Sequence, residues 1–95
     1  GTQITDAGVA QLKERQTLEW LHLGNTQITD AGLPNLESLT GLTYLNLSMT
    51  AVTDDGLKYL KRLTNLTVLF INATKVTKRG IAELKQALPK CKVIH

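Results

Sequence analysis

The sequence aligns with itself at a constant shift of 24 residues, and this repeat constrains the fold more than any other feature. The matching positions include Leu18, Leu42 and Leu66, then Thr26, Thr50 and Thr74, then Gly32, Gly56 and Gly80. Complete units cover residues 18–41, 42–65 and 66–89. Residues 1–17 match the back part of an earlier unit, and residues 90–95 are expected to form a C-terminal closing strand. We therefore expect one repeat domain over 1–95.

Each unit changes its apolar period midway. The alternation in Leu21-His22-Leu23, and in the segments 45–47 and 69–71, predicts short strands with one buried face. Apolar residues then recur at every third position, which predicts a helix with one buried stripe. These positions are Leu33, Leu36 and Leu39, then Leu57, Leu60 and Leu63, then Ile81, Leu84 and Ala87.

The residues around each predicted helix have local roles. Thr29-Asp30 and Thr53-Asp54 are typical helix starts, because a hydroxyl accepts from first-turn amides and a carboxylate favours the positive end of the helix. Thr77-Lys78 departs from this pattern, so the third helix should begin less favourably by a few tenths of a kcal/mol. Each repeated threonine should bond turn backbone, and each repeated glycine should allow close approach of a neighbouring element.

A strand, a turn and a helix in 24 residues return the chain beside its starting strand, so the strands should be parallel. Helices are wider than the ~4.8 Å spacing of strands, so the stack should curve with strands on the inner side. The strand at 20–23 should be an exposed edge. We expect the chain to belong to a longer array, with self-association through this uncapped end as the alternative.

The pattern Leu18-x-x-Leu21-x-Leu23-x-x-Thr26-x-Ile28-Thr29-Asp30-x-Gly32-Leu33 resembles a leucine-rich repeat. It is similar to the repeats of ribonuclease-inhibitor-like, F-box-type and bacterial multi-repeat proteins. The resemblance implies an α/β solenoid, a right-handed βα horseshoe segment, with a short parallel sheet on the concave side and α-helices on the convex side. Thr26 stands where the F-box group often has cysteine, and no F-box segment is present.

Composition excludes several classes. Hydrophobic residues make up 42% and charged residues 20%, as in ordinary globular proteins, and no apolar run approaches the ~18 residues of a membrane span. Cys91 is the single cysteine, which excludes an internal disulfide, and we expect it to be a small buried apolar side chain. No spacing suits a metal or a nucleotide, and the Asp54-Asp55 neighbours do not face one another. We expect no enzymatic activity and no cofactor.

The outward strand positions are the candidate binding residues. They place three of the four aromatic residues on one wall, and aromatic anchors beside polar groups are typical of protein contacts. The predicted partner-binding residues are Trp20, His22, Tyr44, Asn46, Ser48, Phe70 and Asn72, and Gly24, Val68, Lys92 and Ile94 share the wall. The alternative is that cross-strand packing of these rings only stiffens the sheet.

Charge is unevenly distributed, with two basic and five acidic residues in 1–48 and nine basic and three acidic in 49–95. Nucleic acid or anionic lipid could contact the basic helix residues, but most aromatics lie on the other wall, so solvated surface is the preferred reading. We expect a protein-interaction module. The alternatives are a structural spacer without a ligand and the substrate-recognition part of a ubiquitin-ligase-like adaptor.

Overall fold

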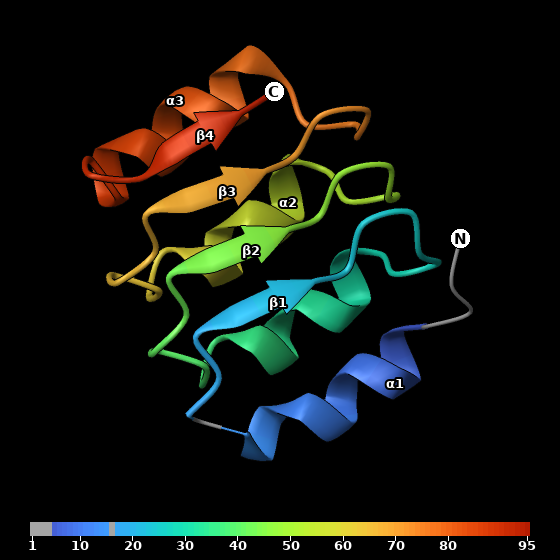
Figure 1. The fold of residues 1–95 in the computed structure, drawn as a ribbon. Coiled ribbons are helices and arrows are strands. Elements are labelled where there is room, and N and C mark those ends of the chain that lie inside the picture. Colours follow the sequence, from blue (N-terminus) through green and yellow to red (C-terminus); the bar gives the residue numbers. More distant parts are fainter. Residues whose placement is uncertain (1–4, 16) are drawn as a thin grey trace.

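A computed structural model describes residues 5–15 and 17–95, in which four short strands form one sheet and helices cover one of its faces (Figure 1). The strands are β1 (Trp20–His22), β2 (Tyr44–Asn46), β3 (Val68–Phe70) and β4 (Lys92–Ile94). The α-helices are α1 (Asp6–Ala10), α2 (Asp54–Leu57) and α3 (Lys78–Ala87). The 3₁₀ helices are η1 (Gln11–Glu14), η2 (Asp30–Leu36) and η3 (Lys58–Leu60).

The sheet has the order β1-β2-β3-β4, and every neighbouring pair is parallel, as the repeat predicts. The register keeps the 24-residue shift, so that Trp20, Tyr44, Val68 and Lys92 lie in one row across the sheet. Within the described residues β1 pairs only with β2, so it lies at one edge of this four-stranded sheet. Self-association through that edge stays a prediction, as does the division of the chain into repeat units.

The turn after each of the first three strands is built in the same way. Asn25, Met49 and Ala73 all have positive φ angles, between 55° and 59°. The repeated threonine follows one residue later, and its hydroxyl donates to the carbonyl of the residue three positions earlier. The pairs are Thr26–Leu23 at 2.7 Å, Thr50–Leu47 at 2.7 Å and Thr74–Ile71 at 2.6 Å. The predicted role of these threonines is confirmed.

The convex side differs from the expected row of α-helices, because η2 is a 3₁₀ helix and α2 continues into the 3₁₀ helix η3. A 3₁₀ helix has three residues per turn, so residues at i and i+3 eclipse one another. The strict three-residue spacing of Leu33 and Leu36 matches that geometry better than the 3.6-residue α period. Gly32 and Pro34 within η2 further weaken an α-helix.

Helix α3 keeps the α geometry over ten residues, and this changes which residue closes its buried stripe. The alignment of units predicts Ala87 at that position, but Ala87 is exposed and Leu88 is buried instead. The buried positions Ile81, Leu84 and Leu88 are spaced by three and then four residues, which is the α-helical pattern. The strict repeat alignment was therefore wrong by one residue here.

The core lies between the sheet and the helices and is almost entirely aliphatic. It includes Leu45 and Leu69 from the strands and Leu36, Leu60 and Leu84 from the convex side, all fully buried. Cys91 is buried in the same cluster, so its prediction as a small apolar side chain is confirmed. Burial raises the pKa of the Cys91 thiol.

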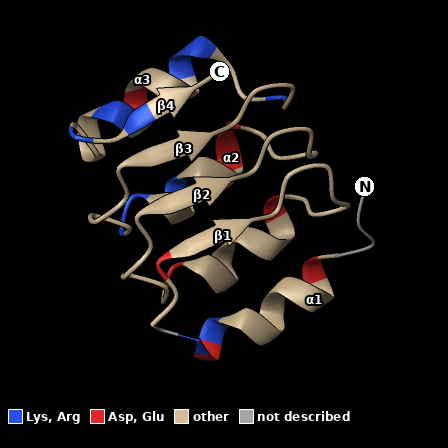
Figure 2. Ribbon diagram, viewed as in Figure 1, with Lys and Arg blue, Asp and Glu red and all other residues tan. Residues whose placement is uncertain are grey.

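Aspartates at helix starts connect successive units, a feature that sequence reasoning missed. The carboxylate of Asp6 accepts from the amide and hydroxyl of Thr29, at 2.8 and 2.6 Å. Asp30 accepts in the same way from Thr53, and Asp54 from Thr77. These residues form what we call the Asp–Thr ladder, and Figure 2 shows its acidic residues at the beginnings of α1 and α2. Each threonine thus caps its own helix and binds the preceding unit.

The ladder also explains the repeated glycines. A Cβ added at Gly32, Gly56 or Gly80 would clash with the carboxylate of Asp6, Asp30 or Asp54 respectively. The predicted close approach is confirmed, and its partner is the aspartate of the preceding unit. Helix α3 begins with Lys78 where the other units have an aspartate. The carboxylate of Asp54 bonds to Thr77, the capping residue of α3, and so places a negative charge at the start of this helix. The hydroxyl of Thr77 is the main reason that the pKa of Asp54 is lowered.

Candidate protein-binding face

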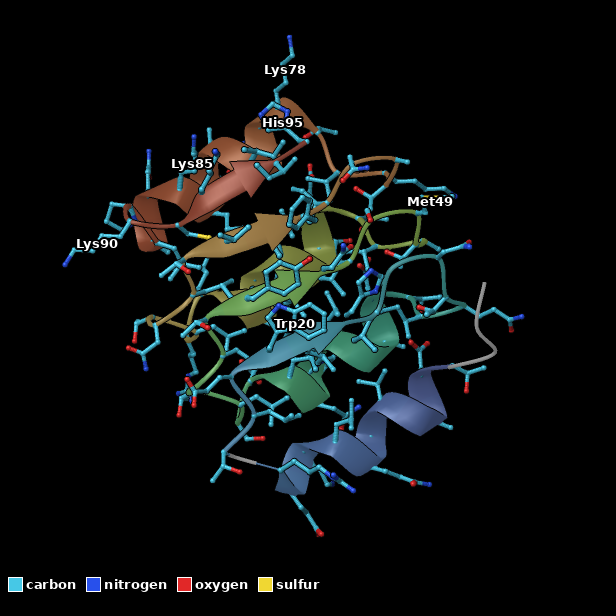
Figure 3. The ribbon with its side chains drawn as sticks, viewed as in Figure 1. Trp20, Met49, Lys78, Lys85, Lys90 and His95 are labelled. Atoms are coloured by element: carbon cyan, nitrogen blue, oxygen red, sulfur yellow. The ribbon has the colours of Figure 1, made fainter. Side chains whose placement is uncertain are left out.

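The face of the sheet opposite the helices is formed by the alternate residues of the four strands. We call it the open sheet face, and Figure 3 shows Trp20 on it, away from Lys78, Lys85 and Lys90 around the α3 end. Its members alternate with core residues such as Leu45, Leu69 and Val93. They are Trp20, His22, Tyr44, Asn46, Val68, Phe70, Lys92 and Ile94.

Three aromatic rings form a continuous row across β1, β2 and β3. Trp20 and Tyr44 are stacked, with ring centroids 4.6 Å apart and planes 11° from parallel. Tyr44 and Phe70 lie 5.6 Å apart at a tilt of 52°. Trp20 keeps 58% of its surface exposed even though it stacks on Tyr44. The row therefore offers an apolar surface, exposed at Trp20 and half-buried at Tyr44 and Phe70.

A polar cluster lies beside the aromatic row. The side-chain oxygen of Asn46 accepts from the amide of Ser48 at 2.9 Å and from its hydroxyl at 2.6 Å. The Gly24 amide donates to Nδ1 of His22 at 3.2 Å, and Nε2 of His22 lies 3.4 Å from the side-chain nitrogen of Asn46. Asn46 is only 9% exposed, so it is more enclosed than a free surface residue.

Gly24 is required by this cluster. A Cβ at that position would lie 2.9 Å from Oδ1 of Asn46 and 3.0 Å from the His22 ring. The strand alternation places Gly24 on the inner wall but gives no hint that the glycine makes room for two side chains there. The contact depends on neighbouring strands, and a single unit of sequence does not show it.

The remaining candidates lie in the turns. Ser48 is half-buried against Asn46, while Asn72 is exposed and its carbonyl accepts from the Met49 amide at 3.0 Å. Met49 is 55% exposed and was missed, because a turn position with positive φ has no apolar period to reveal it. Ile94 was placed on the wall without a role, and it extends the apolar surface beyond Phe70.

Charge on the strands is confined to β4. The residues of β1, β2 and β3 include no Lys, Arg, Asp or Glu, whereas β4 begins with the exposed Lys92 (Figure 2). The open sheet face therefore carries aromatic and uncharged polar residues at the β1 side and a positive charge at the β4 side.

The groups considered for catalysis occupy structural positions. Asp54 accepts two hydrogen bonds from Thr77, and Cys91 is buried, where its Sγ contacts the Lys92 carbonyl oxygen at 3.8 Å.

A cavity of about 210 Å³ lies beside Leu66, Leu88 and Cys91. Among residues 5–15 and 17–95, no group of three or more His, Cys, Asp or Glu residues could hold a metal ion. No helix in this part of the chain is long and apolar enough to cross a membrane.

Comparisons with known proteins agree with this architecture. Residues 16–59 match the family model described as leucine-rich repeats in two copies. A search of curated proteins by sequence finds no match. The structure of internalin C2 from Listeria monocytogenes matches 90% of this chain and 35% of its own, with 29% identity and a TM-score of 0.77.

Two further structures share the fold at lower identity. A second internalin of Listeria monocytogenes matches 97% of this chain and 32% of its own, with 22% identity and a TM-score of 0.62. A repeat protein of Leptospira interrogans matches 90% of this chain and 27% of its own, with 19% identity and a TM-score of 0.54. The chain spans about a third of the length of these internalins.

Proposed function

This chain is a leucine-rich repeat protein, and on that premise we propose that it is an interaction module that binds a protein partner on its open sheet face. The observation that carries the proposal is the exposed stack of Trp20 on Tyr44, continued by Phe70. Aromatic side chains contribute a large contact area at low cost in side-chain entropy. The proposed function includes no chemical reaction.

The polar neighbours of the rings would provide specificity. His22 and Asn72 are exposed, so they are available for direct contacts. Asn46 and Ser48 bond each other, and we assign them the task of holding the polar cluster in place as well as contacting the partner. The site residues thus remain those expected from the sequence, with Asn46 more enclosed than expected.

A double variant and a matched control test the proposal. Affinity capture with the intact protein should recover a partner, and the double variant Trp20→Ala, Tyr44→Ala should lose it while thermal unfolding remains cooperative. The matched control Lys58→Ala, Lys61→Ala removes two exposed side chains from the other side of the molecule and should retain the partner. Equal capture by all three proteins would contradict the proposal and favour a structural spacer, in which the stacked rings only stiffen the sheet.

A further inference from the structure

The hydrogen bonds around His22 fix which of its nitrogens carries the proton. The Gly24 amide donates to Nδ1, so Nδ1 is unprotonated and a neutral imidazole must carry its proton on Nε2. The oxygen of Asn46 already accepts from Ser48, so the Asn46 amide nitrogen faces His22. In the tautomer that the Gly24 bond assigns, Nε2–H of His22 and the Asn46 amide are two donors 3.4 Å apart.

Two donors cannot hydrogen-bond each other, so this pair suits an acceptor atom supplied by a partner. An oxygen placed beside both nitrogens could accept from His22 and Asn46 together. The carbonyl of an extended peptide is an acceptor of this kind, and the stacked rings of Trp20 and Tyr44 would receive the adjacent side chain. The donor pair and the rings come from the same two strands, β1 and β2.

The far end of the same face has a positive charge. Lys92 shares one register row with Trp20, Tyr44 and Val68, and it is exposed. Trp20 and Lys92 are three strand spacings apart, which is about 14 Å. An extended peptide advances about 3.3 Å per residue, so four residues cover this distance. Side chains at n, n+2 and n+4 of such a peptide all point toward the same surface.

We propose that the open sheet face takes an extended acidic peptide segment that crosses the strands. An apolar or aromatic side chain at position n packs on Trp20 and Tyr44, and a small apolar one at n+2 packs on Val68. A carboxylate at n+4 pairs with Lys92, and a backbone carbonyl near n accepts from His22 and Asn46. This assignment rests on the proposed function and specifies the chemistry of the partner at that face.

The test uses synthetic peptides and the emission of Trp20, the single tryptophan of the chain. The probe is an acetylated, amidated peptide with leucine, valine and aspartate at its first, third and fifth positions and serine between them. A second peptide has lysine in place of the aspartate. The aspartate peptide should bind about two- to fivefold more tightly than the lysine peptide, as expected for an exposed ion pair.

Reversing the charge of a single lysine of the protein provides the decisive comparison. Lys92→Glu should invert the preference between the two peptides, whereas Lys90→Glu, the same change at an exposed residue before β4, should leave the preference in place. His22→Phe, which keeps a ring but loses the Nε2 donor, should weaken both peptides by about two- to tenfold. Thermal unfolding of each variant shows whether it is folded.

Two outcomes would overturn the assignment. Equal effects of Lys92→Glu and Lys90→Glu would mean that net charge alone attracts the peptide. Failure of the aspartate peptide to bind, while the intact protein still captures a partner through Trp20 and Tyr44, would overturn the acidic-peptide assignment and leave the proposed function standing. If the partner's capture also proves independent of Trp20 and Tyr44, the proposed function is wrong.

Discussion

At the scale of single residues, charge-assisted hydrogen bonds are among the contacts that join one unit to the next. Each aspartate of the Asp–Thr ladder accepts two bonds from a threonine 23 residues later, and that threonine also caps its own helix. The threonine side chain thus forms hydrogen bonds in two successive units. The sequence shows the aspartates as helix-start residues, but their partners become visible only when the units are stacked.

The substitution Asp30→Ala tests the ladder. Removal of the carboxylate leaves the amide and hydroxyl of Thr53 without their acceptor, and bonds to a charged group contribute about 1.5–3 kcal/mol each in favourable cases. We expect the free energy of unfolding to fall by about 1–3 kcal/mol in a urea titration. Asp55→Ala is the matched control, because it removes an exposed carboxylate from a helix start and should change stability by less than ~0.5 kcal/mol.

Gly56→Ala tests the space that the ladder needs. Alanine favours a helix by about 1 kcal/mol over glycine, yet its methyl group would clash with the Asp30 carboxylate, so the variant should be destabilised by about 1–3 kcal/mol. In the Asp30→Ala background the clash with the carboxylate is relieved and only the contact with Cδ1 of Leu33 remains, so Gly56→Ala should cost less. Additive effects of the two substitutions, measured by urea unfolding, would show that they do not share this contact.

The ladder also predicts a pH dependence. The Thr77 bonds lower the pKa of Asp54 in the folded protein below its unfolded value of about 3.9, so this stabilisation is full at neutral pH and is lost as pH falls through the lowered pKa. Asp54→Asn should therefore flatten the decline in unfolding free energy below about pH 4. Asp55→Asn leaves the Asp54–Thr77 contacts in place and should keep the wild-type decline. Identical curves for all three proteins would contradict this prediction.

At the scale of the elements, the apolar spacing differs between the 3₁₀ helices and the longest α-helix. Leucines spaced strictly by three accompany the 3₁₀ helices of the units 18–41 and 42–65, and the three-then-four spacing of Ile81, Leu84 and Leu88 accompanies the α-helix α3. Sequence reasoning found where the convex elements lie but called all of them α-helical. The difference between periods of 3.0 and 3.6 is small over two turns, which is why the type was not resolved.

The docking of β4 beside β3 can be followed through Cys91, the residue before β4. Its thiol is buried and its pKa is raised, and both properties slow reaction with a thiol reagent. Labelling by a disulfide reagent at pH 8 should be much slower in the folded protein than in urea, and its rate should rise with denaturant as the C-terminal strand opens. Rapid labelling of the folded protein would show that β4 is not docked as described.

At the scale of the whole molecule, the repeat predicts most of the architecture. The parallel strands, their 24-residue register and the exposed aromatic wall all follow from stacking identical units, and the structure has them. The contacts between units were not predictable, because Gly24, Asn46 and the ladder aspartates acquire their roles from neighbours 22 to 24 residues away. The partner remains a proposal based on the chemistry of the open sheet face.

The central claim is that this face is exposed to solvent and carries Trp20 on its surface. Collisional quenching of tryptophan fluorescence by acrylamide tests it directly, because the chain has a single tryptophan that is 58% exposed. The quenching constant of the folded protein should be at least half that measured in urea. Strong protection of the folded protein, relieved only on unfolding, would place the indole inside the core and contradict the account.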